Sequence, residues 1–131
     1  MPNGSIAPTG TPYTTQGYTF GCLNANDGTS CASLSVLGPN NRQYPGSPAL
    51  FNNNIYGITT LARADGASFN LFSAAMSPLF GNRVSNTVGF EGFLASGGTV
   101  TQSFTLFSSP SPLVFYTFTG FENLSSVRFR L

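Results

Sequence analysis

Residues 99–106 carry the most regular alternation of apolar and polar side chains in the chain. Val100, Phe104 and Leu106 fall on one side of this segment, and every second position between them and around them is Thr or Ser. Successive side chains of a β-strand point to opposite faces of a sheet, so this period of two predicts a half-buried strand.

Residues 84–94 form a second alternating segment just before the first. Val88 and Phe90 fall on its apolar face, and Glu91 falls on its polar face. The sequence Ala-Ser-Gly-Gly at residues 95–98 separates the two segments, and glycine supplies the positive φ that tight hairpin turns need. The two segments are therefore predicted to form an antiparallel hairpin.

The rest of the chain shows shorter strand signals, separated by turn-forming residues about every 8–12 positions, a spacing typical of sandwiches and barrels. We expect an all-β fold, a two-sheet antiparallel β-sandwich of jelly-roll type with about eight or nine strands. Residues 1–12, rich in Pro and Gly, are expected to be an irregular lead-in to a single domain at residues 13–131. The remaining predicted strands are residues 13–20, 32–37, 55–63, 68–76, 113–119 and 124–130.

Charge is scarce, at 7% of residues against roughly 25% in an average soluble domain. The formal net charge of +1 is too small to attract nucleic acid or an anionic membrane surface, so neither is expected as a partner. Weak charge also gives little repulsion between copies, which favours self-association. Arg128 and Arg130 are expected to point outward from the last strand and to guard a sheet edge, in preference to forming an anion site.

Two cysteines, Cys22 and Cys31, flank a loop rich in turn formers, and we predict that they form a disulfide. A disulfide and a neutral polar surface together indicate a secreted protein, extracellular or at the cell surface. The alternative is a pair of reduced thiols in a cytosolic domain. No stretch approaches the ~20 apolar residues of a membrane span, so membrane insertion is not expected.

The chain lacks several of the residue types that catalysis most often uses. The chain contains no His and no Lys, which excludes Ser-His-Asp, Cys-His and Ser-Lys arrangements. Glu91 with Glu122, or Asp27 with Asp65, are the pairs left for a glycosidase, and solvated surface acids occupy such positions routinely. We therefore expect no enzyme activity.

Asp27 and Asp65 each lie in a loop rich in Asn and Gly, where carbonyl oxygens could complete the oxygen shell of a structural calcium ion, and the loop at residues 24–28 is the better candidate. They are the candidate metal ligands of the chain, and no other cofactor is expected. The alternative is that each acid forms an Asx turn followed by glycine.

Two loop segments, residues 40–45 and 51–56, combine aromatic side chains with amide or guanidinium groups. These are the groups that stack on a sugar ring and hydrogen-bond its hydroxyls. The same residue types are common in loops without a ligand. The candidate ligand-binding residues are Arg42, Tyr44, Asn52, Asn53, Asn54 and Tyr56.

Phe72, Phe93 and Phe107 fall out of phase with the apolar alternation of their strands. Outward Phe side chains on a nearly uncharged domain would form an adhesive patch. The alternative is that both faces of the sheets are partly covered.

Four phrases carry a family resemblance: Leu-Phe-Asn-Asn at 50–53, Thr-Leu-Ala-Arg-Ala-Asp-Gly-Ala-Ser-Phe-Asn-Leu at 60–71, Gly-Gly-Thr-Val-Thr-Gln-Ser-Phe at 97–104 and Phe-Glu-Asn-Leu-Ser-Ser-Val-Arg-Phe at 121–129. With them the chain resembles the β-sandwich domain of secreted bacterial proteins that carry a PEP-CTERM sorting tail. Those proteins are similar to jelly-roll carbohydrate-binding modules and are associated with the extracellular matrix and cell envelope. The chain departs from their pattern by stopping before the usual final strand and sorting tail.

Together these observations predict a non-catalytic extracellular binding domain that recognises carbohydrate or polysaccharide through its loop Tyr, Asn and Arg residues. The alternative is a structural protein of the cell surface or biofilm matrix that assembles with further copies of itself.

Overall fold

The computed structural model describes residues 6–8, 12–31, 34–37, 49–52, 57–76, 85–107 and 114–130. All regular elements in these ranges are β-strands, and every strand pair is antiparallel, which confirms the all-β prediction. No helix in this part of the chain is long and apolar enough to cross a membrane. The strands are β1 (Ile6–Pro8), β2 (Tyr13–Thr15), β3 (Tyr18–Asn24), β4 (Leu34–Leu37), β5 (Ala49–Asn52), β6 (Gly57–Arg63), β7 (Ser73–Met76), β8 (Ser85–Leu94), β9 (Thr99–Phe107), β10 (Val114–Thr117) and β11 (Leu124–Arg130).

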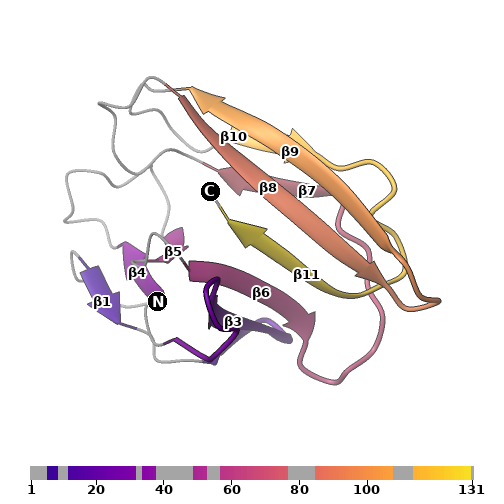
Figure 1. The fold of residues 1–131 in the computed structure, drawn as a ribbon, viewed down its shortest axis with the longest axis horizontal. Coiled ribbons are helices and arrows are strands. Elements are labelled where there is room, and N and C mark those ends of the chain that lie inside the picture. Colours follow the sequence, from indigo (N-terminus) through magenta and orange to yellow (C-terminus); the bar gives the residue numbers. More distant parts are fainter. Residues whose placement is uncertain are drawn as a thin grey trace.

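The strands form one large and two small sheets (Figure 1). The large sheet has six strands in the order β2-β3-β6-β11-β8-β9, and the small sheets have the orders β1-β4-β5 and β10-β7. The hairpin β8–β9 is paired over its whole length with no shift in register, and Gly97 and Gly98 of its turn both have positive φ. The predicted hairpin is therefore confirmed.

Both small sheets cover the same face of the large sheet. Residues directly opposite in an antiparallel pair share a face, and Leu61 on β6, opposite Val127 on β11, packs against the main core together with Met76 of β7. Thr59 lies on the same face as Leu61, two residues away, and it accepts a hydrogen bond from Asn52 of β5. The large sheet is thus one layer of a β-sandwich, and the two small sheets lie on the other side of the core.

Phenylalanine dominates the core between β8, β9, β11 and the β7–β10 pair. The ring of Phe90 packs edge-on against Phe118, with centroids 4.8 Å apart, and stacks on Phe129 at 5.0 Å. Phe121 is 1% exposed and contacts Phe118 at 4.9 Å. Edge-to-face and offset-stacked ring pairs at these distances stabilise a core beyond their burial of apolar area.

The structure differs from the predicted elements at several points. The segment predicted as one strand at residues 13–20 is two strands joined by a tight turn at Gln16 and Gly17, whose φ values are 50° and 81°. Gln rarely adopts positive φ, so the sequence carried only half of the turn signal. Ile6–Pro8 of the expected irregular lead-in forms β1 and pairs with β4, and Ala49–Asn52 forms β5, which the sequence did not predict.

The position of the last strand corrects one expectation. β11 lies between β6 and β8 near the centre of the large sheet, so Arg128 and Arg130 do not guard an edge. Their exposed side chains instead lie on the outer face of the large sheet, the face turned away from the core. The reason is nonlocal pairing, because the last strand inserts between two strands formed much earlier in the chain.

Candidate functional site

Cys22 and Cys31 form the predicted disulfide, with their Cα atoms 5.1 Å apart. Cys22 is 2% exposed and belongs to β3, whereas Cys31 follows the loop that leaves the same strand. The Cys31 amide also donates to the Cys22 carbonyl at 3.0 Å. The bond therefore ties the end of this loop back onto the strand from which it starts.

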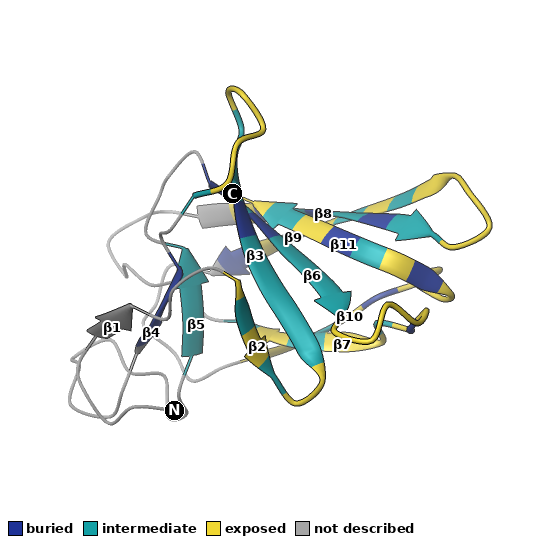
Figure 2. Cartoon of the chain, turned by 90° about the horizontal axis from the view of Figure 1, so that it is seen from below, coloured by how far each residue is buried: buried dark blue, intermediate teal, exposed yellow. Residues whose placement is uncertain are grey.

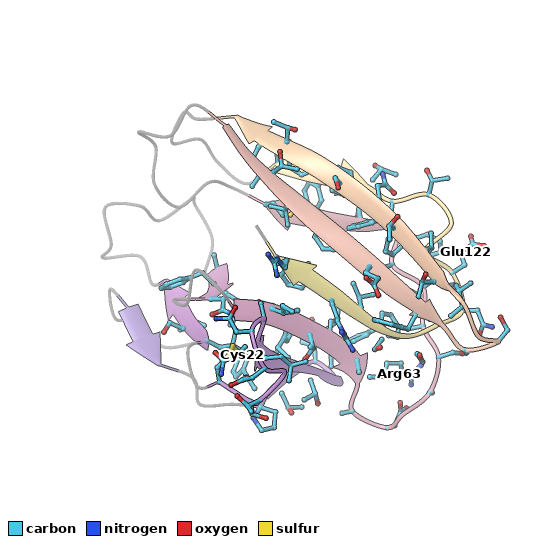
Figure 3. The ribbon with its side chains drawn as sticks, viewed as in Figure 1. Cys22, Arg63 and Glu122 are labelled. Carbon is cyan, nitrogen blue, oxygen red and sulfur yellow. A yellow bond between two sulfur atoms is a disulfide. The ribbon has the colours of Figure 1, made fainter. Side chains whose placement is uncertain are left out.

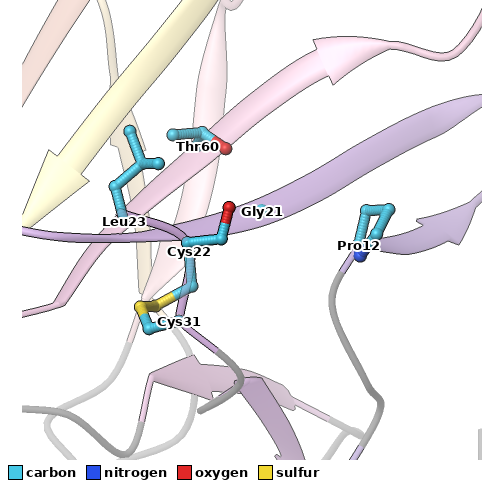
Figure 4. Close-up of a pocket in the computed structure, with 7 residues that line it drawn as sticks. Pro12, Gly21, Cys22, Leu23, Cys31 and Thr60 are labelled. Carbon is cyan, nitrogen blue, oxygen red and sulfur yellow. A yellow bond between two sulfur atoms is a disulfide. The ribbon is translucent and has the colours of Figure 1, made fainter. Parts of the chain in front are cut away.

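A pocket of about 330 Å³ lies beside the disulfide (Figure 4). Its lining includes Gly21 and Thr60, which are opposite one another on β3 and β6, and Ser30 from the returning loop. A Cβ on Gly21 would lie 2.6 Å from the Thr60 hydroxyl, so glycine is what lets that hydroxyl occupy this part of the face. The remaining lining residues are Pro12, Cys22, Leu23 and Cys31.

Hydrogen bonds within the loop fix its shape. Asp27 Oδ1 accepts from the Thr29 hydroxyl at 2.7 Å and from the Thr29 amide at 3.0 Å. The Asn24 side-chain amide donates to the same hydroxyl at 3.0 Å. The two Thr29 donors, the hydroxyl foremost, hold the pKa of the Asp27 carboxyl below its usual value. Asp27 therefore forms an Asx turn within this loop.

Asp65 forms a comparable turn after β6. The Ala67 amide donates to its carboxylate at 3.0 Å, and the Arg63 guanidinium pairs with the other carboxylate oxygen. The amide first and the guanidinium second lower the pKa of Asp65. Both carboxylate oxygens of Asp65 are thus bonded by residues that lie two positions away in the chain.

The two candidate calcium ligands are not brought together. Asp27 follows the end of β3 where Asn24 pairs with Gly57, whereas Asp65 follows the opposite end of β6, where Arg63 pairs with Tyr18. Figure 3 marks Cys22 and Arg63 toward opposite ends of this strand pair. No group of three or more potential metal-ligating side chains occurs among the described residues.

Among the candidate sugar-binding residues, the structure describes only Asn52. Its side-chain amide donates to Cys22 Sγ at 3.2 Å and to the Thr59 hydroxyl at 3.3 Å. The Asn52 side chain also packs against Gly57, because a Cβ added at Gly57 would lie only 2.5 Å from the Asn52 amide nitrogen. Asn52 therefore joins the small sheet β1-β4-β5 to the large one. The other candidates, Arg42, Tyr44, Asn53, Asn54 and Tyr56, lie outside the described residues.

Glu91 and Glu122, one candidate pair of acids for glycoside hydrolysis, lie in different elements of the fold. Glu91 lies within β8 on the outer face of the large sheet, opposite Arg128 and Thr101 on the neighbouring strands. Glu122 is exposed in the loop before β11 (Figure 3).

The β7–β10 pair leaves an apolar surface open to solvent (Figure 2). Phe115 is 76% exposed, Phe72 is 60% exposed and Val114 is 47% exposed. Ala75 lies opposite Phe115 and is also exposed. Ala75 and Phe115 face away from the core, whereas Val114 lies opposite Met76 at one end of the pair and Phe72 precedes β7 at the other. We call these four exposed residues the ribbon patch. The face opposite Ala75 and Phe115 packs on the core through Ala74, Met76 and Tyr116.

The out-of-phase Phe residues have different outcomes. Phe72 is outward, as the adhesive-patch hypothesis expects. Phe93 is only partly exposed and carries the Arg128 guanidinium over its ring. The side chain of Phe107 lies outside the described part of the structure. The sequence did not single out Val114 and Phe115, because their apolar run with Tyr116 is typical of a strand buried on both faces.

No protein family model, curated protein or solved structure matches this chain.

Proposed function

We propose that this domain is a non-catalytic structural module of the cell surface or extracellular matrix whose partner is a further copy of itself. The observation that carries the proposal is the ribbon patch, above all the Phe115 side chain with 76% of its surface in solvent. Exposed apolar patches on folded domains mark interaction sites, because burying them against a partner removes apolar area from water.

The charge distribution supports the same proposal. With a net charge of +1 and only 7% charged residues, two copies repel one another weakly at any orientation. None of Phe72, Ala75, Val114 and Phe115 needs a charged or hydrogen-bonding partner, so a matching apolar surface from a second copy would satisfy them.

The Cys22–Cys31 disulfide supports an extracellular location. Disulfides persist in secreted and cell-surface proteins and are reduced in most cytosolic ones. The disulfide also restricts the unfolded chain and so stabilises the folded domain.

The test is association of the full chain as a function of concentration, measured by sedimentation velocity. We expect oligomers that dissociate on dilution. The double variant Phe72→Ser/Phe115→Ser should weaken association at least about tenfold, because burying one Phe side chain contributes about 1.5–3 kcal/mol and about 1.4 kcal/mol corresponds to a factor of ten. Phe115→Tyr keeps the ring and is the matched control. A wild-type chain that stays monomeric up to millimolar concentration would contradict the proposal.

A second function, carbohydrate recognition, is favoured by the pocket beside the disulfide. Its volume of about 330 Å³ lies at the lower end of the range for small-molecule sites, which suits a single sugar residue. Ser30 and Thr60 provide hydroxyl groups and Pro12 provides an apolar wall. This site differs from the loop residues that the sequence indicated.

Binding to a panel of immobilised glycans and insoluble polysaccharides tests this second function. Thr60→Val should abolish binding at the pocket, whereas Tyr44→Ala and Tyr56→Ala should abolish it if the sequence-predicted loops hold the sugar. Repeating the panel with chelator in place of calcium would reveal whether binding requires calcium. Silence across the whole panel would contradict carbohydrate recognition.

A further inference from the structure

The two edges of the large sheet are protected very differently. One edge is β2, which has three residues and follows directly on Pro12. The other edge is β9, which runs for nine residues from Thr99 to Phe107 and contains no proline and no charged residue. Short strands, proline and charge are the usual devices that prevent pairing at an edge, and β9 has none of them. Figure 1 shows β9 at the outermost position of the sheet.

Hydrogen bonds in the hairpin turn show which backbone groups of β9 face the open edge. The Leu94 amide donates to the Gly98 carbonyl, and the Gly97 amide donates to the Leu94 carbonyl, each at 3.0 Å. Leu94 and Gly98 thus form a hydrogen-bonded pair, and such pairs alternate along an antiparallel ladder. Gln102 and Phe104 therefore point their amides toward β8. The groups that point away are those of Thr99, Thr101, Ser103 and Thr105.

These backbone groups of β9, which point away from β8, have no strand partner among the described residues. The strand itself is held firmly in place, because the Gln102 side chain accepts from the Thr119 amide at 3.0 Å and donates to the Thr117 carbonyl at 3.2 Å. The edge is therefore a rigid template, so a pairing strand would find its donors and acceptors already ordered.

We propose that β9 pairs antiparallel with β9 of a second copy about a two-fold axis at Ser103, joining two six-stranded sheets into one continuous sheet. This inference rests on the proposed self-association and adds to the ribbon patch a second surface through which copies associate. Ser103 is the middle residue of β9, so this register overlaps both strands completely. It forms about six new backbone hydrogen bonds, two for each pair of facing residues near the axis.

The side chains of β9 fit this arrangement on both faces. On the outer face, Thr101 would lie beside Thr105 of the partner subunit, and Ser103 beside its own equivalent, so that small hydroxyl groups meet without any charge. On the inner face, Val100 would lie beside Leu106 of the partner subunit. Cross-strand pairs of Thr and Ser and of apolar residues stabilise sheets, and like charges destabilise them.

Charge substitutions at Ser103 test the two-fold axis directly. Ser103 is exposed, and the nearest position on β8 is Gly89, whose Cβ would lie 3.8 Å from the Ser103 hydroxyl, so a longer side chain has room. Ser103→Lys alone and Ser103→Glu alone should each weaken association at least about tenfold, because like charges meet at the axis. An equimolar mixture of the two variants should associate at least as strongly as the wild type.

Thr14→Lys on β2 is the matched control, since it adds the same charge to the other edge of the same sheet. Unchanged association of this variant is expected, and a loss equal to that of Ser103→Lys would overturn the two-fold arrangement in favour of β9 pairing with β2. If both Ser103 variants associate like the wild type while Phe72→Ser/Phe115→Ser does not, β9 pairing is overturned and the proposed function stands. A monomeric wild type overturns both.

Amide hydrogen exchange gives an independent readout. In the monomer the amides of Gln102 and Phe104 are protected by β8, whereas those of Thr101, Ser103 and Thr105 point away from β8, where no described strand pairs with them. Raising the concentration of the wild type should slow exchange at these three amides at least about tenfold and leave Gln102 unchanged. Equal slowing at all five positions, or none, would overturn the pairing.

Discussion

The guanidinium carbon of Arg128 lies 4.8 Å from the centroid of the Phe93 ring on the outer face of the large sheet. The two residues come from β11 and β8, which are neighbouring strands. The face of an aromatic ring carries negative potential and attracts a cation. The contact covers an aromatic side chain that would otherwise be open to solvent, and it gives Arg128 a partner within the sheet.

Removal of this cation should cost a modest amount of stability. We expect Arg128→Met, which keeps the length of the side chain, to lower the free energy of unfolding by about 0.5–1 kcal/mol, the range for exposed cation–π pairs. Urea unfolding monitored by circular dichroism would measure the change. Arg130→Met, on the same strand and face, is the control, and an equal loss in both variants would contradict a specific role for the Phe93 ring.

Gly92 is predicted to tolerate no side chain. A Cβ at this position would lie 2.8 Å from Leu124 Cδ2 and 3.0 Å from Val100 Cγ1. Because Leu124 is fully buried, these atoms have little room to move, and Gly92→Ala should destabilise the fold by about 1–3 kcal/mol through overpacking.

Gly89→Ala provides the matched control in the same strand. Its Cβ would meet nothing closer than the Ser103 hydroxyl at 3.8 Å, which is ordinary contact. The substitution should be neutral or slightly stabilising, because alanine restricts the unfolded chain more than glycine does. Similar thermal unfolding of the two variants would contradict the packing around Gly92.

Loss of the disulfide should destabilise the domain by about 2–3 kcal/mol. Cys22 and Cys31 are nine positions apart, and the chain-entropy account gives this magnitude for so short a loop. The double variant Cys22→Ala/Cys31→Ala, compared with the wild type in urea, measures it. Wild-type protein under strong reductant should lose a similar amount, and no change in either experiment would show that the loop is held by its other hydrogen bonds alone.

Thr29 is predicted to control the ionisation of Asp27. Thr29→Val removes the hydroxyl that donates to the carboxylate but keeps the backbone amide, so the pKa of Asp27 should rise toward its usual value while staying below it. Carbon-detected NMR titration of the carboxyl group measures the shift. An unchanged Asp27 pKa in this variant would contradict the hydroxyl contact.

The same lowered pKa values at Asp27 and Asp65 fix the sign of the pH dependence. A carboxyl whose pKa is lower in the folded state stabilises the fold above its unfolded pKa, near 3.8, and this contribution is lost as the pH falls through the folded value. Stability should therefore be insensitive to these two groups from neutral pH to about pH 5 and should decline in more acidic solution.

The candidate site was only partly predictable from sequence. The disulfide follows from two cysteines in a turn-rich loop, because their separation is local. The loop-like neighbours of Asn52 predict a ligand contact, and only the structure shows that its amide bonds Cys22 and Thr59, which are 30 and 7 positions away. A contact made across two sheets leaves no periodic trace in the sequence.

The sequence by itself determined the all-β class, the β8–β9 hairpin and the inward and outward faces of β9, because each depends on side-chain alternation or turn chemistry between close neighbours. Only the tertiary structure decided that β11 lies inside the large sheet, that Phe115 faces solvent, and that β9 is the last strand of the large sheet. These features depend on which distant strands pair, and pairing depends on the combined burial of many residues that no local pattern records.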